Sequence, residues 1–127
     1  MSENRINLTD AEWNIMEDLW ENAPLTGREI TESMEKRMGW NRSTTLTLLR
    51  RLEEKGAIES NDEGRKKLFL PIISREEVAL QETEEFLERI YNGSVSMMIS
   101  ALTKKKALAK SEIDELYVML KDLEGGK

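Results

Sequence analysis

The stretch of sequence that decides the fold is RSTTLTLLRRLEEKGAIESNDEGRKKLFLP, which runs from Arg42 to Pro71. Four residues recur at helical spacing in its first half: Thr45, Leu48, Leu49 and Leu52. They predict a helix with one buried face, whose N-cap is Asn41 or Ser43. Lys55-Gly56 ends this helix, because a cation suits the negative end of the dipole and glycine suits a left-handed cap.

The second half of the same stretch has the pattern of a β-hairpin. Residues 57–60 and 67–70 are predicted strands, residues 61–64 form the turn between them, and Pro71 ends the second strand. Three basic side chains lie beside the turn, namely Arg65, Lys66 and Lys67. The hairpin is therefore expected to carry a cluster of basic side chains just after its turn.

Two further helices are predicted before this stretch, and each begins with a capping box. The first box is Thr-Asp-Ala-Glu at residues 9–12, and the second is Thr-Gly-Arg-Glu at residues 26–29. Pro24 ends the first helix, and the residue after it forms a short extended link. Three helices followed by a basic hairpin define a winged helix-turn-helix, so we expect a DNA-binding domain at residues 1–73.

Residues 74–127 predict three more helices. A long helix begins after Ser74, a shorter one covers 95–102, a loop lies at 104–106, and a last helix begins near Ser111. A segment of about fifty residues buries too little surface to be stable alone. Its apolar stripes must therefore pack on the first domain or on a second copy of the chain.

A second copy is the expected partner, because a long helix leaving a winged-helix domain suits two-fold pairing and matches a palindromic DNA site. The side chains expected at this homodimer interface are Leu80, Phe86, Leu87, Ile90, Tyr91, Met98, Ile99, Leu102, Leu116 and Leu120. The alternative is a compact monomer of six helices. The predicted fold class is thus mainly α, with a winged helix-turn-helix domain followed by a three-helix dimerisation domain.

The composition excludes several classes of function. Cys and His are both absent from the 127 residues. Their absence excludes disulfides, thiolate or imidazole catalysis, and zinc or copper sites built from those ligands. No apolar stretch reaches the roughly 18 residues of a transmembrane helix, and no signal-peptide pattern opens the chain. We therefore expect a cytoplasmic protein with no membrane insertion and no cofactor.

Charge is unevenly distributed along the chain. The net charge is −6, yet residues 36–67 carry nine basic against five acidic side chains. The segments on either side, 1–35 and 68–127, are both acidic. A basic segment inside an acidic protein is typical of a confined nucleic-acid-binding surface. A chance fluctuation on a solvated face is the alternative interpretation.

The buried stripe of the third helix determines which of its residues point outward. A recognition helix reads base edges with its first turns and contacts phosphates with its flanks. We expect Arg42 to contact guanine and Leu46 to pack on thymine methyl groups, with Arg50 and Arg51 on phosphates. The alternative is that Arg50, Arg51 and Lys55 pair with Glu53, Glu54 or other carboxylates. The residues predicted to contact DNA are Arg28, Arg42, Ser43, Thr44, Leu46, Thr47, Arg50, Arg51, Arg65, Lys66 and Lys67.

Several of these motifs resemble the penicillinase-repressor family (BlaI/MecI/CopY). The resemblance is carried by Leu-Thr-Asp-Ala-Glu-Trp-Asn-Ile-Met at residues 8–16, by Trp20 and Trp40, and by the spacing to Lys55-Gly56. Tyr-Asn-Gly-Ser at residues 91–94 is also similar, and the likeness covers almost the whole chain. The resemblance implies a homodimeric repressor that binds double-stranded operator DNA with dyad symmetry.

The resemblance also bears on how such a repressor is induced. Many members look to be inactivated by proteolysis in the fifth helix after a membrane sensor detects a β-lactam, so a regulatory protease is a further suggested partner. This chain has Ala101-Leu102 where those members resemble one another with an Asn-Phe cleavage bond. The copper-responsive branch uses C-terminal cysteines, which this chain lacks.

Two other functions are compatible with parts of the pattern. A winged helix used only for protein contact would present Leu46 and the hairpin to a partner protein, as an adaptor. An enzyme would have to use carboxylates such as Glu82, Glu84, Glu85 and Glu88. These carboxylates lie on the polar side of a predicted helix without a positioned base, so we expect no catalysis.

Overall fold

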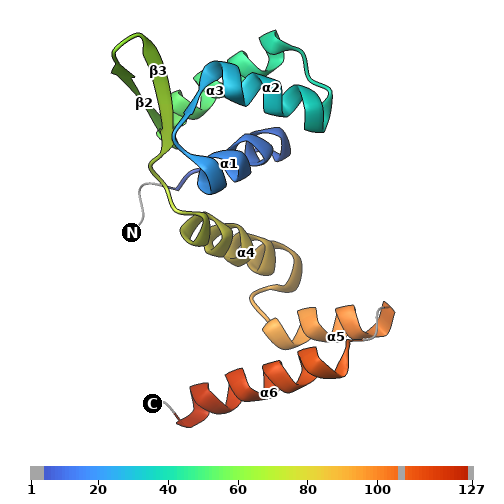
Figure 1. Ribbon diagram of the computed structural model, residues 1–127. Coiled ribbons are helices and arrows are strands. Elements are labelled where there is room, and N and C mark those ends of the chain that lie inside the picture. Colours follow the sequence, from blue (N-terminus) through green and yellow to red (C-terminus); the bar gives the residue numbers. More distant parts are fainter. Residues whose placement is uncertain (1–4, 106–107, 126–127) are drawn as a thin grey trace. The chain divides into compact units, whose positions relative to one another are not determined.

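The computed structural model describes residues 5–105 and 108–125, apart from the side chain of Glu63. Within these residues the chain forms six helices and one three-stranded antiparallel sheet, which confirms the predicted mainly α, winged helix-turn-helix fold (Figure 1). The dimerisation role of the last three helices stays a prediction. In chain order the elements are α1 (Asp10–Asn22), β1 (Leu25–Thr26), α2 (Gly27–Met38), α3 (Arg42–Lys55), β2 (Ile58–Glu63), β3 (Lys66–Pro71), α4 (Arg75–Tyr91), α5 (Val95–Lys105) and α6 (Lys110–Gly125).

The first two helices begin with the capping boxes that the sequence predicts. The hydroxyl of Thr9 accepts a hydrogen bond from the Glu12 amide at 3.1 Å, and the Glu12 carboxylate accepts one from the Thr9 amide at 2.9 Å. Thr26 and Glu29 repeat the arrangement with the same distances. These reciprocal bonds satisfy amides that a helix start leaves without partners, and so they fix where α1 and α2 begin.

The central strand of the sheet is β3, which pairs with β1 on one side and with β2 on the other. Leu25 of β1 lies opposite Phe69 of β3. The short extended link predicted after Pro24 is therefore the third strand of the wing sheet, and it ties the link between α1 and α2 to the hairpin.

The hairpin turn is tighter than the sequence predicts. The two strands pair as far as Glu63 opposite Lys66, so the loop contains Gly64 and Arg65, and the prediction of a turn at 61–64 is wrong. Gly64 has φ +69°, a left-handed conformation that glycine adopts without a side-chain clash. A glycine at the first loop position allows a two-residue turn, which lets β2 continue further than expected.

The hydrophobic core of the first unit lies between α1, α2, α3 and the sheet. Its buried apolar residues are Ile15, Met16, Leu19, Ile30, Met34, Leu48, Leu49, Leu52, Ala57, Ile58 and Phe69. The predicted inward stripe of α3 belongs to this core, together with the buried Thr45. The core therefore covers one face of α3 and leaves the opposite face pointing outward.

The chain divides into two compact units, Met1–Thr83 and Glu84–Lys127. The division falls inside α4, so the first turns of this helix belong with the winged-helix unit. The functional boundary at 73/74 stays a prediction. In residues 5–105 and 108–125, no helix is both long enough and apolar enough to cross a bilayer.

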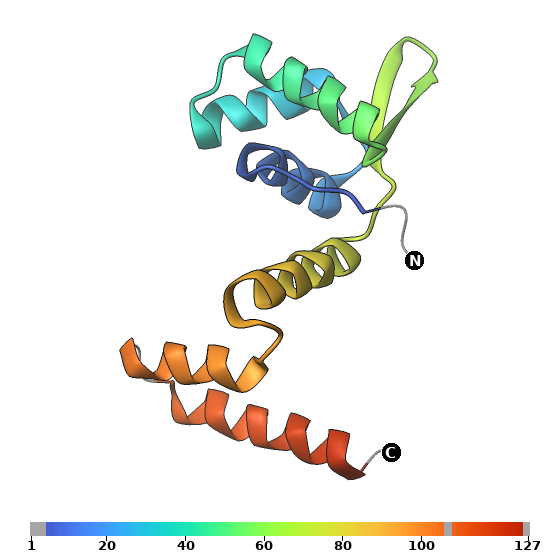
Figure 2. The ribbon, with the colours of Figure 1, turned by 180° about the vertical axis from the view of Figure 1, so that it is seen from behind.

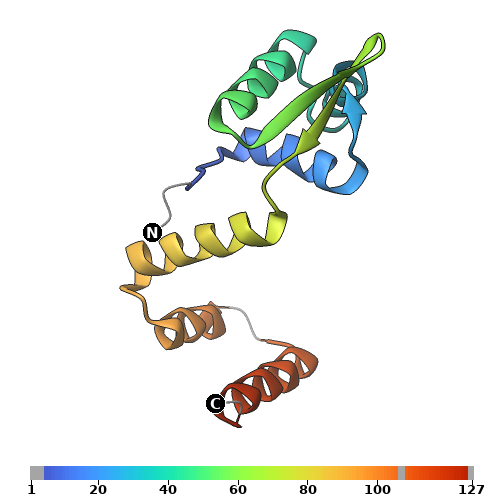
Figure 3. The same cartoon turned by 90° about the vertical axis from the view of Figure 1, so that its left-hand side faces the viewer.

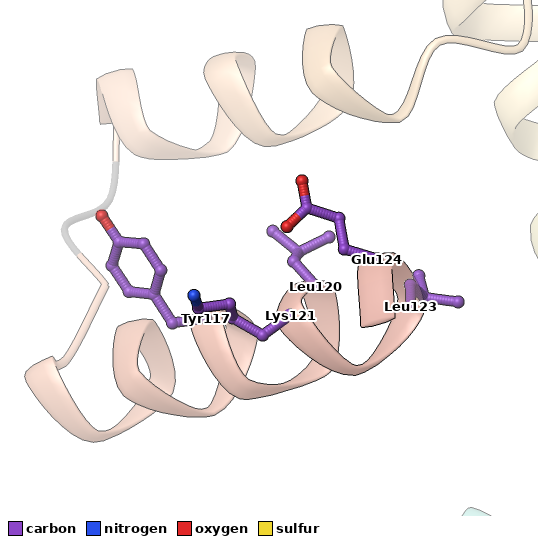
Figure 4. Close-up of a pocket in the computed structure, with 5 residues that line it drawn as sticks. All are labelled: Tyr117, Leu120, Lys121, Leu123 and Glu124. Carbon is purple, nitrogen blue, oxygen red and sulfur yellow. The ribbon is translucent and has the colours of Figure 1, made fainter. Parts of the chain in front are cut away.

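The second unit leaves most of its apolar side chains exposed. No side chain is buried among the described residues of α5 and α6. One shallow depression of about 600 Å³ is lined entirely by α6, with Tyr117, Leu120, Lys121, Leu123 and Glu124 around it (Figure 4). Figure 4 shows Leu120 and Glu124 on the side of α6 along which α5 runs. The two helices thus lie near each other without forming a core.

Two predicted ends in this unit are wrong. α5 continues through Lys105, so Lys104 and Lys105 are helical rather than part of a loop, and Lys106 lies outside the described residues. α6 begins at Lys110, so Ser111 lies inside the helix instead of capping it.

Candidate nucleic-acid interface

The recognition helix α3 is positioned by its caps and its buried face. Asn41 Oδ1 accepts a hydrogen bond from the Thr44 amide at 2.8 Å, so Asn41 rather than Ser43 is the N-cap. Gly56 ends the helix in a left-handed conformation, with φ +83°. The four predicted inward residues are all buried: Thr45, Leu48, Leu49 and Leu52. The opposite face of the helix is therefore presented outward along its whole length.

This outward face combines short hydroxyl groups, guanidinium groups and one apolar side chain. At about 100° per residue, Ser43, Thr47 and Arg50 point most directly away from the buried stripe. Thr47 is half-buried, and Leu46 is 37% exposed. The other predicted contacts on the helix are exposed: Arg42, Ser43, Thr44, Arg50 and Arg51. Glu54 lies on the same outward line, and the sequence prediction did not consider it.

The exposed arginines Arg50 and Arg51 of α3 form no ion pair with the residues that the structure describes. The expected competitor Glu53 instead accepts a hydrogen bond from the Ser60 hydroxyl at 2.8 Å. Both guanidinium groups therefore keep their donors available for phosphate oxygens, which they match in geometry.

The wing adds three exposed cations near its tip. Arg65 lies in the hairpin loop, and Lys66 and Lys67 are the first residues of β3. Lys67 Nζ lies 5.6 Å from the centroid of the Phe69 ring, a cation–π distance. Figure 2 shows the hairpin starting beside the end of α3, and Figure 3 shows its tip projecting past the helices of the first unit. The wing thus presents these three cations near its projecting tip.

A groove joins the recognition helix to the wing and to the start of α2. It has a volume of about 670 Å³, and Leu46, Lys66 and Lys67 are among its lining residues. The remaining lining residues come from α2 and the strands around it: Thr26, Gly27, Arg28, Glu29, Glu32 and Phe69. The structure therefore brings together three predicted contact regions that are far apart in the sequence.

Arg28 occupies a different electrostatic position from the other predicted contacts. Its Nε donates to Glu32 Oε2 at 3.1 Å, and both side chains are largely exposed. Arg28 and Arg42 also line a second depression, next to Glu32 and Glu35. A surface ion pair of this kind contributes little to stability, so Arg28 can exchange Glu32 for another anion at small cost.

A partly buried ion pair connects the end of α3 to the start of α1, and the sequence prediction did not identify Glu12 as the partner of Lys55. Lys55 Nζ donates to Glu12 Oε1 and to the carbonyl oxygen of Asn7. Burial raises the pKa of Glu12, but hydrogen bonds from Lys55 and from the Thr9 amide lower it, and the net pKa lies below the usual value. Glu12 therefore stays charged, and it holds the last turn of the recognition helix.

The residues predicted at a homodimer interface lie on α4, α5 and α6. Five of them are exposed, namely Leu80, Phe86, Ile90, Leu102 and Leu120. The other five are half-buried, namely Leu87, Tyr91, Met98, Ile99 and Leu116. Phe86 and Tyr91 meet edge to face, with ring centroids 6.0 Å apart. Most of this apolar surface thus has no cover within the part of the chain that the structure describes.

A three-helix domain with an outward basic helix and a basic wing defines a winged-helix DNA-binding protein. The family model described as Penicillinase repressor matches residues 8–122. The chain therefore belongs to the penicillinase repressor family, as its motifs suggested. As a member of this family it is a DNA-binding repressor of transcription and not an enzyme.

Individual relatives extend over nearly the same length. The chain is 30% identical to the penicillinase repressor of Bacillus licheniformis, over 91% of this chain and 90% of that protein. It is 22% identical to the methicillin resistance regulatory protein MecI of Mammaliicoccus sciuri, over 94% and 98%. A solved structure, the monomeric form of Bacillus licheniformis BlaI in complex with the blaP half-operator, is 29% identical. It matches 57% of this chain and 88% of that chain, with a TM-score of 0.53.

Proposed function

We propose that this repressor acts as a homodimer on a dyad-symmetric operator, with α3 of each copy in the major groove of one half-site. The observation that carries the proposal is the outward face of α3, where Arg50 and Arg51 lack partners among the described residues. An exposed Leu46 among hydroxyl groups fits a surface that contacts bases better than one that contacts only water. BlaI bound to its half-operator supports the same use of the related domain.

Each part of the interface has a distinct role in this proposal. Arg42 donates two hydrogen bonds to a guanine edge, while Leu46 packs on thymine methyl groups. Ser43, Thr44 and Thr47 are short enough to approach bases or phosphates. Arg50 and Arg51 bind phosphates, and so does Arg28 after releasing Glu32. Arg65, Lys66 and Lys67 of the wing follow the backbone or enter the minor groove.

The dimer in this proposal forms through the apolar faces of α4, α5 and α6. Large apolar side chains left exposed on these helices are typical of an interaction site. A second copy is the simplest partner, because two-fold pairing places two recognition helices about 34 Å apart, one turn of DNA. The bound dimer would then repress by blocking access of polymerase to the promoter, in the cytoplasm, at a resistance or stress gene.

A regulatory protease stays a prediction. The bond between Ala101 and Leu102 lies within α5, and both residues are exposed. A protease binds an extended segment, so cleavage at this bond would require α5 to unwind locally. Incubation of the full chain with a candidate sensor protease, followed by mass spectrometry of the fragments, would test the prediction.

A mobility-shift series tests the proposed DNA surface. The Arg50→Ala/Arg51→Ala variant should lose about 10- to 100-fold in affinity for all duplexes alike, because it removes two phosphate contacts. The matched control is Lys104→Ala/Lys105→Ala, which removes the same charge from α5 and should bind like the wild type. Equal binding by both variants would contradict the proposal and favour an adaptor that uses Leu46 for protein contact.

A further inference from the structure

A cluster of side chains fastens the start of α4 to α1 within the first unit. This cluster, which we call the α4 clamp, consists of Trp13, Glu17, Trp20, Arg75 and Gln81. Trp13 Nε1 donates to Glu17 Oε2 at 2.7 Å, and Arg75 Nη2 donates to the same oxygen at 3.1 Å. The Arg75 guanidinium also lies over the Trp13 ring, with Cζ 5.7 Å from the centroid. One carboxylate thus joins a side chain of α1 to the first residue of α4.

The rest of the α4 clamp holds the chain on either side of this contact. Trp20 Nε1 donates to the carbonyl oxygen of Ile73 at 2.9 Å, just before α4 begins. Gln81 Nε2 donates to the carbonyl oxygen of Ile6 at 3.0 Å, in the second turn of α4. Trp13 and Trp20 meet edge to face with centroids 5.4 Å apart. Contacts at three successive points therefore fix the direction of the first two turns of α4.

The helix itself continues beyond the α4 clamp. α4 runs without interruption from Arg75 to Tyr91, and its sequence contains neither proline nor glycine. Sharp kinks in helices occur mostly at such residues or at local bulges, so the sequence of α4 contains no typical kink site. Val78, at the end of the first turn of α4, is also buried.

We propose that the α4 clamp determines the spacing between half-sites that the repressor accepts. The inference rests on the proposed dimer, in which the C-terminal helices hold two copies together. With both α4 helices fixed on their winged-helix units, the two recognition helices have one separation and one rotation about the DNA axis. Both can then enter the major groove at one spacing, which gives the operator its required length. The clamp residues are positioning residues, separate from the predicted DNA contacts.

Duplexes of altered length test this role. The full chain first selects a dyad duplex from a randomised pool, and that duplex is then lengthened by two base pairs at its centre. The insertion rotates one half-site by about 70° relative to the other. The wild type should lose about tenfold or more in affinity, because both half-sites can no longer be bound together. A duplex with one half-site reports on the DNA surface alone.

The informative variant is Trp13→Phe/Arg75→Gln, which removes both hydrogen bonds to Glu17 and the cation over the ring. It should bind the single half-site within about twofold of the wild type, yet lose less than about threefold on the lengthened duplex. Glu77→Gln is the matched control, because Glu77 is exposed on the same turn of α4 outside the clamp. It should keep the wild-type dependence on spacing.

Two results would overturn the inference while leaving the repressor intact. One is a clamp variant with the wild-type dependence on spacing, and the other is a wild type that binds both duplex lengths equally. Failure of the wild type to bind any selected duplex would contradict the proposed function instead. Thermal unfolding identifies a variant that does not fold, and Gln81→Leu, which removes the single bond to the Ile6 carbonyl, then repeats the test.

Discussion

At the scale of single residues, the recognition helix depends on an ion pair that lies away from its DNA-contacting face. Glu12 is 1% exposed, and its partner Lys55 is about a third exposed at the side chain. The pair joins the first turn of α1 to the last turn of α3. Because a buried carboxylate without a partner is unfavourable, the two residues act as one unit.

Removing the lysine should therefore destabilise the first unit. Lys55→Ala leaves the Glu12 carboxylate without its cation, and we expect the free energy of unfolding to fall by about 2 kcal/mol. Urea unfolding followed by tryptophan fluorescence measures the change. Lys36→Ala is the control, since Lys36 is exposed at the end of α2, and it should change stability by about 0.5 kcal/mol or less. Equal effects of the two substitutions would contradict the role of the pair.

At acid pH, the free energy of unfolding depends on the protonation of two carboxyl groups, those of Glu12 and Glu17. The pKa of Glu12 lies below its usual value, and the pKa of Glu17 is lowered by hydrogen bonds from Trp13 and then Arg75. A carboxyl whose pKa is lower in the folded state stabilises the fold above its unfolded pKa, near 4.5, and this contribution is lost as pH falls through the folded pKa.

We therefore expect the free energy of unfolding to be nearly constant between about pH 7 and pH 5.5 and to decrease below about pH 4.5. Glu12→Gln should make this decrease shallower, because one of the titrating groups is gone. Urea unfolding at a series of pH values measures the slope. A slope that Glu12→Gln leaves unchanged would show that this carboxyl does not contribute.

At the scale of elements, the ends of α3 depend on backbone conformation as much as on side chains. Gly56 has φ +83°, and a Cβ added there would meet nothing within 4 Å. Gly27, at the start of α2, has no such restriction, and its added Cβ would lie 3.6 Å from Phe69 Cε2, an ordinary contact. Alanine substitutions at these two positions therefore distinguish the effect of backbone strain from that of steric crowding.

Gly56→Ala should lower the free energy of unfolding by about 1 kcal/mol, because the left-handed conformation is unfavourable for a residue with a Cβ. Gly27→Ala should be neutral within about 0.5 kcal/mol, since alanine is a better helix former than glycine. Thermal unfolding monitored by circular dichroism compares the two. A larger loss for Gly27→Ala would mean that packing against Phe69 is tighter than the structure indicates.

Local chemistry explains which elements the sequence could predict. Capping boxes, the Lys55-Gly56 helix end and the apolar stripe of α3 involve residues within a few positions of one another, and all were confirmed. The hairpin turn was placed too early because pairing between strands overrides the polar character of residues 61–63. The ion pair of Glu12 with Lys55 joins residues far apart in the sequence, so it depends on tertiary packing that no local pattern encodes.

At the scale of the whole molecule, many apolar side chains of the second unit have no packing partner among the residues that the structure describes. Tyr117, Leu120 and Leu123 are each more than half exposed. The stripes were predicted from helical spacing, but their partner could not be read from one chain. Family membership accounts for the repressor function, while the homodimer stays a proposal that oligomeric state can test.

Leu120→Asp should weaken the proposed dimer, because it places a charge within the apolar face of α6. Sedimentation velocity should show the wild type as a dimer at micromolar concentration and the variant as largely monomeric. The control is Lys121→Asp, which introduces the same side chain at the adjacent position of α6. A wild type that sediments as a monomer over the whole concentration range would contradict the proposed assembly.

The most direct test of the central claim is a binding titration of the full chain with its selected dyad duplex at increasing salt. Fluorescence anisotropy measures the affinity, and sedimentation of the complex gives the number of chains per duplex. We predict two chains per duplex and an affinity that falls steeply and linearly with the logarithm of salt concentration, as phosphate contacts from α3 and the wing require. An affinity indifferent to salt, or the absence of any complex at low salt, would contradict the account.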